Sequence, residues 1–383
     1  MRIGILTGGG DVPGLNSVIK SVTYRATEID AEVVGIRRGW EGLTHLDGAD
    51  DPRYVMPLDR RNTRPIDRTG GTVLHTSRTN PRKMRGSRLP TTLDATRAES
   101  LRVGEDVYDL TPLVLENLGK LGVDHLVAIG GDDTLSYAKM LDRAGFPVVA
   151  VPKTMDNDVR GTEYCIGFST AVARAKEAVN RQRTTIGSHE RIGVFRIFGR
   201  DAGFTALYTA FVTSVRCVVP EFEFELDTLA ETLAADRRAN PSGYAIVIAS
   251  EGAMWAGGSL REVGEPDAYG HRHKMDVGEA LASEINVRTG VETIHSDLTY
   301  DLRSGEPDAL DQLVATTFAN MAVDLIVERR SGTMTAVVDG RYAAVPIPDP
   351  ELGPRKVDAS LYNLARFRPH YRGRIGQPLL FAS

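Results

Sequence analysis

The chain of 383 residues lacks most features that mark secreted, membrane or nucleic-acid-binding proteins. Its two cysteines, Cys165 and Cys217, give neither a disulfide framework nor a metal-ligand spacing, so a cytoplasmic location is expected. No run approaches about 18 consecutive apolar residues, so we predict no membrane-spanning helix. Met1 leads directly into a strand pattern, so we expect no signal peptide. The formal net charge of −5 argues against a general nucleic-acid binder.

Short apolar strands alternate with amphipathic helical patterns along most of the chain. We expect strands at 3–6, 32–36, 126–129, 148–151, 193–197 and 245–249, and helices at 110–120, 134–143 and 170–184. This alternation predicts an α/β fold with parallel sheets covered by helices on both faces. The chain is longer than a typical domain and no composition shift marks a linker, so we predict two interleaved domains. The arginine-rich region 50–97 is predicted to be an ordered loop region over a cleft.

Two aspartate-rich loops follow successive predicted strands. The first is Gly-Gly-Asp-Asp-Thr at 130–134, and the second is Pro-Lys-Thr-Met-Asp-Asn-Asp at 152–158. Strand ends of this kind carry the ligand sites of open α/β sheets. Clustered carboxylates bind an anion only through a divalent cation, so the loops predict a Mg²⁺-phosphate site anchored by Asp132. The alternative is a pair of turns in which the aspartates only cap backbone amides.

Three further segments suit phosphate or sugar binding. The glycine-rich turn 7–16 precedes a helix that begins near Leu15, although its spacing matches neither the dinucleotide fingerprint nor the P-loop, and a plain tight turn is the alternative. Segment 188–203 carries arginines that suit a phosphorylated substrate. Glu251 ends a predicted strand and suits sugar hydroxyls, or is a plain surface glutamate. A basic cluster, in which we single out Arg78, comprises Arg60, Arg61, Arg64, Arg68, Arg78, Arg82, Lys83, Arg85 and Arg88.

In this order the motifs resemble those of the phosphofructokinase family. The matching segments are Gly-Gly-Asp-x-Pro-Gly-x-Asn at 9–16, Thr-Ser-Arg-Thr-Asn-Pro at 76–81, the two aspartate-rich loops and Ser-His-Glu-Arg-Ile at 188–192. Phe-Gly-Arg at 198–200 stands where the family has Met-Gly-Arg, a mild change between apolar side chains. The resemblance runs from residue 3 to about 252. It implies Mg²⁺-dependent phosphoryl transfer to the 1-hydroxyl of fructose 6-phosphate.

The resemblance also implies an architecture and a set of roles. We expect two similar three-layer αβα domains with mainly parallel sheets and the active site in the cleft between them. The phosphoryl-donor domain would comprise 1–167 and about 302–352, and the sugar-phosphate domain 168–301 and 353–383. Arg191 would reach into a neighbouring subunit's site, which implies a homodimer or homotetramer.

The roles carried over fall into three groups. The catalytic group has Asp156 as the base together with Thr154, Lys153, Asp133 and Arg200. The donor-binding group is Gly9, Gly10, Arg78, Asp133 and Lys153. The sugar-phosphate group is Thr154, Asp156, Arg191, Phe198, Gly199, Arg200, Glu251, Tyr300 and Arg303.

Asp133 and Lys153 bear on which phosphoryl donor is used. ATP-using members of the family typically have glycine at both positions. A carboxylate about 4 Å from the α-phosphate of ATP would cost on the order of 4 kcal/mol at an effective dielectric constant near 20. Lys153 supplies a positive charge that suits the shorter inorganic pyrophosphate. Both residues together are the pattern of the pyrophosphate-dependent branch, which we predict here, with ATP as the alternative donor.

One departure from the family pattern concerns the acceptor. Ile294 stands where an arginine usually grips the 6-phosphate, whereas Tyr300 and Arg303 match the pattern. Loss of one charge-assisted contact of roughly 1.5–3 kcal/mol would weaken binding of fructose 6-phosphate or mark another ketose phosphate, such as sedoheptulose 7-phosphate. An NAD kinase-like protein shares only the Gly-Gly-Asp loop. A non-catalytic paralogue would be expected to lack Asp156 or Arg200, and both are present.

Overall fold

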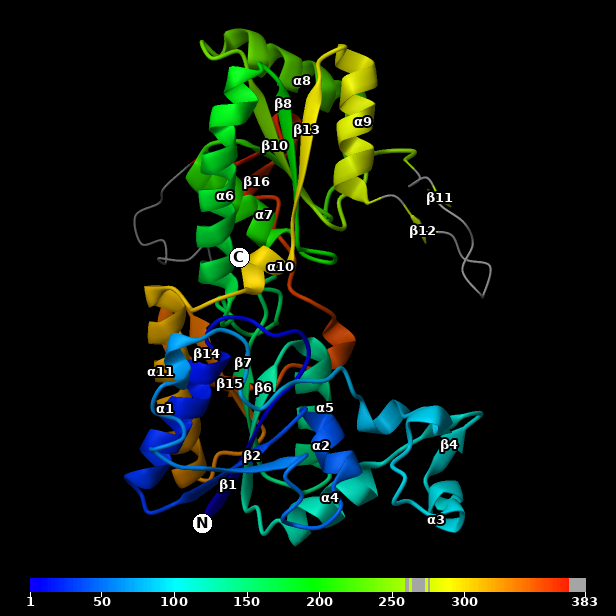
Figure 1. Ribbon diagram of the computed structural model, residues 1–383, viewed down its shortest axis with the longest axis vertical. Coiled ribbons are helices and arrows are strands. Elements are labelled where there is room, and N and C mark those ends of the chain that lie inside the picture. The colour runs from blue at the N-terminus through cyan, green and yellow to red at the C-terminus, as the bar shows by residue number, and fades with distance from the viewer. Residues whose placement is uncertain (259–261, 264–272, 275, 372–383) are drawn as a thin grey trace. The chain divides into compact units, whose positions relative to one another are not determined.

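The chain folds into two compact units that interleave along the sequence. The structure, a computed structural model, describes residues 1–258, 262–263, 273–274 and 276–371 (Figure 1). Unit 1 comprises Met1–Thr154, Val159–Gly167 and Arg303–Gly353, and unit 2 comprises Met155–Asp158, Phe168–Leu302 and the chain from Pro354 onward. Residues 372–383, which the sequence assigns to the sugar-phosphate domain, lie outside the described residues. The roles assigned to the two domains stay predictions.

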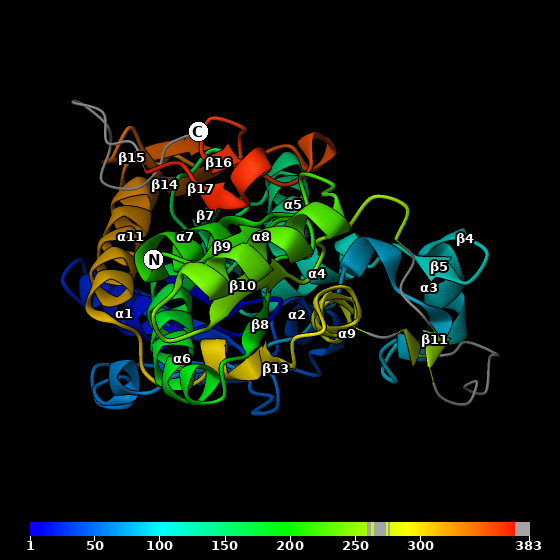
Figure 2. The same ribbon diagram turned by 90° about the horizontal axis from the view of Figure 1, so that it is seen from above.

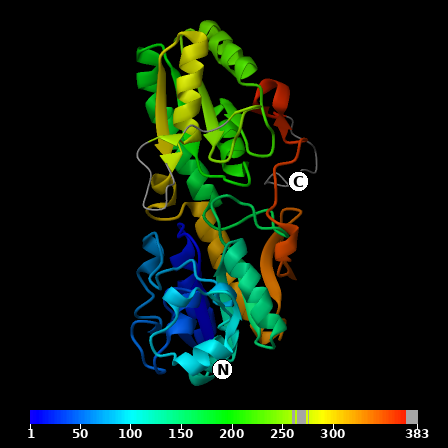
Figure 3. The ribbon, with the colours of Figure 1, turned by 90° about the vertical axis from the view of Figure 1, so that its right-hand side faces the viewer.

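Unit 1 is built on a seven-stranded sheet in the order β15-β14-β7-β6-β1-β2-β3. The five inner strands run parallel, and the edge strands β3 and β15 pair antiparallel to their neighbours. In Figure 3 the orange strands β14 and β15 lie on one side of unit 1 and the blue strands on the other. The strands are β1 (Arg2–Thr7), β2 (Glu32–Ile36), β3 (Val55–Leu58), β6 (His125–Gly130), β7 (Val148–Pro152), β14 (Thr333–Val338) and β15 (Arg341–Pro346).

Helices cover both faces of this sheet, which gives the three layers (Figure 1). Helices α1 (Leu15–Thr27) and α11 (Ala309–Val327) pack together on one face. Helices α2 (Trp40–His45), α4 (Thr111–Lys120) and α5 (Asp132–Arg143) lie on the other. The remaining short elements of unit 1 are η1 (Ile66–Arg68), η2 (Pro81–Lys83), η3 (Gly86–Arg88), α3 (Ala95–Ser100), β4 (Arg102–Gly104), β5 (Val107–Tyr108) and η4 (Pro350–Leu352).

Helix α11 is long and apolar enough to cross a membrane by length and composition alone. The expectation from the sequence overlooked it because polar residues such as Asp311 and Asp324 interrupt its apolar run. Its buried face, which includes Val314 and Phe318, packs on α1, β7 and β14. Helix α11 is therefore apolar because it packs in the core of unit 1.

Unit 2 contains a four-stranded, fully parallel sheet in the order β13-β8-β10-β9. Helices α6 (Phe168–Ser188) and α7 (Phe204–Thr213) cover one face, and α8 (Leu226–Ala239) and α9 (Val277–Thr289) cover the other (Figure 2). The strands are β8 (Ile192–Ile197), β9 (Arg216–Val218), β10 (Ala245–Ser250) and β13 (Thr293–Leu298). The short elements are β11 (Glu262–Val263), β12 (His273–Lys274), α10 (Tyr300–Arg303), β16 (Tyr362–Asn363), η5 (Leu364–Arg366) and β17 (Arg368–Pro369), and the last residue of α10, Arg303, already belongs to unit 1.

The α/β fold predicted from the sequence is confirmed, and the two units differ in size, with seven strands against four. Every residue of β7 and β10 is buried, which matches apolar runs that pack on both faces of a parallel sheet. Helix α5 begins at Asp132 rather than 134, since acidic residues suit the first turn of a helix. Region 50–97 is mostly irregular as predicted, although strand β3 was missed.

Candidate active site

Lys153 is the centre of the site residues in unit 1. It directly follows β7, its backbone N–H bonds the carbonyl of Gly130 at 2.9 Å, and only 3% of it is exposed. Its Nζ donates a hydrogen bond of 2.5 Å to the carbonyl oxygen of Gly10. Burial lowers the pKa of this ammonium to about 8, and the positive charge of nearby Arg303 is the second-largest cause of this decrease. A buried cation beside a second cation is a favourable place for a polyanion.

The glycine-rich turn after β1 lets these cations approach the backbone. Gly9 has a φ of 78°, and a Cβ there would lie 3.4 Å from Nζ of Lys153. A Cβ on Gly10 would lie 2.9 Å from Nη1 of Arg303, so a side chain would displace the guanidinium. The carbonyl of Gly9 accepts a 2.6 Å hydrogen bond from Thr76, which ties the turn to the loop carrying exposed Arg78.

Asp132 and Asp133 are exposed residues in the first turn of α5. This helix follows β6, the strand that lies between β1 and β7 in the sheet. Among the described residues, no group of three or more His, Cys, Asp or Glu side chains could hold a metal ion. Mg²⁺ is usually held by one or two carboxylates together with substrate phosphates. An exposed carboxylate at the carboxyl ends of the parallel strands therefore suits Mg²⁺ that would be bound together with a phosphate substrate.

The predicted sugar-phosphate residues gather in unit 2, with Thr154 and Arg303 as exceptions. Phe198 contacts Tyr300 edge to face, with ring centroids 6.5 Å apart. Gly199 has a φ of 124°, and a Cβ on it would lie 2.4 Å from Oγ of Ser250. Arg200 is exposed and pairs with Asp201 at 3.2 Å.

Charged pairs orient two further residues of this set. Arg196 lies between Glu251, at 3.3 Å, and Asp297, at 2.7 Å. Arg191, expected to reach a neighbouring subunit, pairs with Glu292 at 2.5 Å in this chain. The sequence offered Arg196 only as one of several arginines in its segment. Its partner on the neighbouring strand follows from the register of β8 and β13, which pairs residues 196 and 297.

Arg303 belongs to unit 1 and lies beside Gly10 and Lys153. The sequence placed residue 303 within the expected donor domain, at about 302–352, but gave its side chain a sugar-phosphate role, and that role stays a prediction. Unit 1 thus brings Gly9, Gly10, Lys153 and Arg303 together. Spacing along the chain could not reveal this, because about 150 residues separate Arg303 from Lys153.

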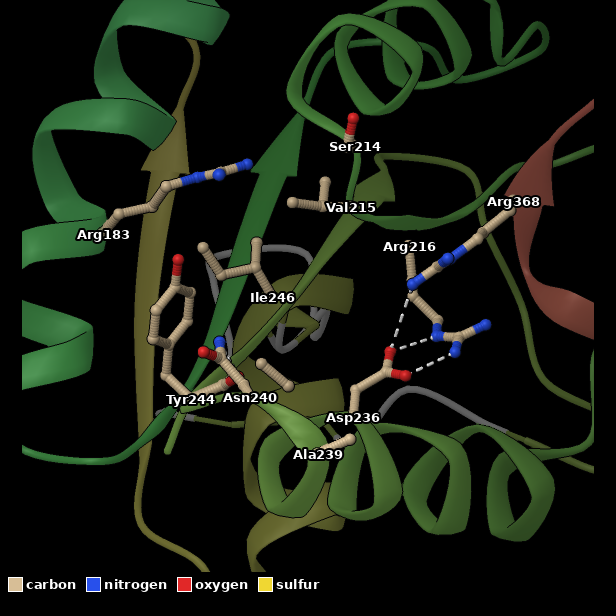
Figure 4. Close-up of a pocket in the computed structure, with 11 residues that line it drawn as sticks. Arg183, Ser214, Val215, Arg216, Asp236, Ala239, Asn240, Tyr244, Ile246 and Arg368 are labelled. Carbon is tan, nitrogen blue, oxygen red and sulfur yellow. Dashed lines mark hydrogen bonds and ion pairs between the residues drawn. The ribbon is translucent and has the colours of Figure 1, made fainter. Parts of the chain in front are cut away.

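A pocket of about 280 Å³ in unit 2 contains none of the predicted site residues (Figure 4). Arg183, Arg216 and Arg368 line it, and Arg216 and Arg368 both pair with Asp236. Asp236 therefore neutralises part of the positive charge of this pocket.

The chain belongs to the phosphofructokinase family, since the family model "Phosphofructokinase" matches residues 2–326. It is 38% identical over 367 residues to the pyrophosphate--fructose 6-phosphate 1-phosphotransferase of Streptomyces coelicolor, covering 94% of this chain and 98% of the relative. It is 36% identical over 340 residues to ATP-dependent 6-phosphofructokinase 3 of the same organism, covering 88% and 91%. The fold resembles that of a pyrophosphate-dependent phosphofructokinase from Nitrosospira multiformis, with a TM-score of 0.77, 15% identity and coverage of 96% and 89%.

Proposed function

We propose that the protein transfers a phosphoryl group from pyrophosphate to the 1-hydroxyl of fructose 6-phosphate, reversibly, giving fructose 1,6-bisphosphate and phosphate. The observation that carries this proposal is the buried ammonium of Lys153, held at Gly10 beside Arg303. Pyrophosphate is short and highly charged, so the two cations Lys153 and Arg303 would favour its binding by pairing with its phosphates. Asp133, in the first turn of α5, adds a negative charge that would oppose the α-phosphate of ATP.

The residues divide the work between binding and proton transfer. Gly9, Gly10, Lys153 and Arg78 in unit 1 bind the donor, and Arg200, Glu251 and Tyr300 in unit 2 bind the sugar phosphate. Asp156 removes the proton from the 1-hydroxyl as its oxygen attacks phosphorus, and Lys153 stabilises the negative charge on the departing phosphate. Lys153 and Asp156 are three residues apart, so their Cα atoms are separated by at most about 11 Å. Asp132 would hold Mg²⁺, which neutralises charge on the phosphates when bound.

The enzyme is proposed to be a cytoplasmic homodimer or homotetramer, with Arg191 serving a neighbouring subunit's site. The pair of Arg191 with Glu292 would have to break for this, and its cost is small because Glu292 is exposed and Arg191 is only partly buried. Ile294 favours a second candidate acceptor, sedoheptulose 7-phosphate, because the usual arginine at the 6-phosphate is missing.

The proposal is tested by supplying Mg²⁺, pyrophosphate and either ketose phosphate to the purified protein and identifying the bisphosphate by ³¹P NMR. Fructose 1,6-bisphosphate is expected, with Lys153→Met inactive. Lys139→Met is the matched control, because Lys139 pairs with Asp349 on the surface of unit 1 and should keep full activity. Product only from sedoheptulose 7-phosphate would favour the second candidate, and no product from either sugar would overturn the proposal.

A further inference from the structure

The C-terminal part of the chain contacts the loop that carries Asp156. Residues 155–158 and the chain from Pro354 onward both belong to unit 2, although about 200 residues separate them. Arg355 is 9% exposed, and its Nη2 donates a 2.9 Å hydrogen bond to the carbonyl of Asn157. Its backbone N–H donates a 2.6 Å hydrogen bond to the carbonyl of Asp158. One residue thus binds two successive carbonyls that follow Asp156.

The other side of Asp156 is held from helix α7. Oγ1 of Thr205 is buried and donates a 2.7 Å hydrogen bond to the carbonyl of Met155. Backbone groups on both sides of Asp156 are therefore bonded to distant elements of the same unit. Such bonds limit how far a loop carboxylate can move, since they restrict the backbone from which it projects.

Asn157 has a left-handed conformation, with a φ of 55°. Asparagine tolerates this region better than most residues, but a non-glycine residue there still needs support from its surroundings. The carbonyl bonds from Arg355 supply this support in the segment 157–158.

The environment of Arg355 suits a guanidinium in particular. Its guanidinium carbon lies 4.2 Å from the ring centroid of Phe204, the first residue of α7. A planar guanidinium can stack on a ring while its N–H groups donate in its own plane, which an ammonium cannot do. Lysine at this position would therefore lose either the ring contact or the hydrogen bond.

The same segment supports a second loop of the sugar-phosphate set. The backbone N–H of Val357 donates a 2.8 Å hydrogen bond to Oε1 of Glu221, which also accepts from Gly203 at 2.9 Å. Gly203 ends the turn that begins with Phe198, Gly199 and Arg200. Residues 354–358 thus connect to both loops.

We propose that Arg355 is a positioning residue that holds the 155–158 loop so that Asp156 reaches the hydroxyl of the acceptor. This inference rests on the proposed function, in which Asp156 is the general base. Arg355 acts through the loop backbone and does not touch substrate.

The kinetic test compares Arg355→Met, which keeps the apolar stem, with Arg355→Lys and Arg216→Met. Arg216 is a matched control, because it donates to the carbonyl of Arg366 and so anchors a different part of the C-terminal segment. Arg355→Met should lower kcat by about ten- to a hundredfold with less than about a twofold change in the KM for pyrophosphate. Arg355→Lys should recover only part of this loss, and Arg216→Met should keep kcat.

Combining each variant with Asp156→Asn separates positioning from general destabilisation. Without the base carboxylate, Arg355→Met should cost almost nothing further in kcat, because the two changes remove one function. The same fold loss in both backgrounds, or an equal loss in Arg216→Met, would overturn the proposal. If Arg355→Met does not fold, Thr205→Val serves instead, with the same expected non-additivity with Asp156→Asn.

Hydrogen exchange of the ligand-free protein tests the contact independently of any activity. Peptides covering 155–158 should exchange at least about tenfold faster in Arg355→Met than in the wild type, and at wild-type rates in Arg216→Met. Unchanged exchange at 155–158 would contradict the proposed role. A wild-type protein without phosphotransferase activity would overturn the proposed function, and the exchange result would still decide whether Arg355 holds the loop.

Discussion

The side chain of Lys153 lies in an environment that destabilises its charged ammonium form. It is almost fully buried, and Arg303 and Arg78 add positive potential, so the pKa of its ammonium falls from 10.5 to about 8. In the proposed function, donor binding requires the charged ammonium of Lys153, which the free protein holds below the lowered pKa and loses above it. A bound polyanion would raise this pKa again, because it stabilises the ammonium.

The pH dependence of donor capture follows from this pKa. The kcat/KM for pyrophosphate should be constant between pH 6.5 and 7.5 and fall by up to about tenfold per pH unit above pH 8, as Lys153 loses its proton. Initial rates at low pyrophosphate and saturating sugar phosphate measure this profile. Lys139→Met should share the profile, and a plateau that continues to pH 10 would contradict the assigned role of Lys153.

Asp133 is more exposed than the charge argument from the sequence assumed. In a water-like dielectric its repulsion of a phosphate about 4 Å away falls from about 4 to about 1 kcal/mol. The discrimination against ATP that we propose for Asp133 is therefore expected to lie between about 1 and about 4 kcal/mol.

Replacing Asp133 should improve the use of ATP. Asp133→Gly removes the carboxylate, and we expect the kcat/KM for ATP to rise by about five- to a thousandfold, according to the local dielectric. The neighbouring Asp132→Gly is the contrasting variant, since loss of the proposed Mg²⁺ ligand should impair use of both donors. Coupled assays with each donor decide this, and an ATP value unchanged in Asp133→Gly would exclude Asp133 as the discriminating residue.

At the scale of elements, the proposed site residues lie largely in turns that follow strands. Gly199 shows how conformation and packing restrict the residue type in such a turn. Its φ of 124° suits glycine alone, and a Cβ would approach Ser250 and the carbonyl of Ala202 within 2.5 Å. Glycine is therefore required both by conformation and by packing in the turn that carries Arg200.

Substituting Gly199 should destabilise unit 2 and impair sugar binding. Gly199→Ala is expected to cost about 1–3 kcal/mol from backbone strain, with a further contribution from the clash. Gly257→Ala is the matched control, because Gly257 also has a positive φ of 67° but nothing lies within 4 Å of its Cβ position. Thermal unfolding should show a lower Tm for Gly199→Ala than for Gly257→Ala, and equal values would contradict the packing argument.

Six strands could be predicted because buried parallel strands are continuous apolar runs, as at 126–129 and 148–151, whereas the main-sheet strands β3, β9, β13, β14 and β15 were not predicted. The loops after them could also be predicted, since glycine and aspartate mark the strand ends. Other features have no local signal. Arg303 beside Gly10 and Arg355 at Asn157 depend on contacts between residues far apart in the sequence. Helix α11 was missed as a highly apolar helix because single polar residues interrupt its apolar run.

At the scale of the whole molecule, the two units carry different parts of the proposed reaction. Gly9, Gly10 and Lys153 belong to unit 1, whereas Arg200, Glu251 and Tyr300 belong to unit 2. A defect in one set should therefore leave binding to the other set intact.

Ligand-induced stabilisation checks this division. Pyrophosphate with Mg²⁺ at about 100 times its Kd should stabilise the native state by about 2.7 kcal/mol, and so should fructose 6-phosphate at the same multiple of its own Kd. Lys153→Met should abolish the shift in Tm with pyrophosphate and keep the shift with fructose 6-phosphate. Arg200→Met should show the opposite pattern. Loss of both shifts in either variant would contradict separate binding sets.

The most direct test of the central claim compares phosphoryl donors in the wild-type protein. With Mg²⁺ and saturating fructose 6-phosphate, kcat/KM is measured for pyrophosphate and for ATP under the same conditions. The charges at Lys153 and Asp133 predict a value for pyrophosphate that exceeds the value for ATP by at least about tenfold. A higher value for ATP would show that these charges do not select the donor.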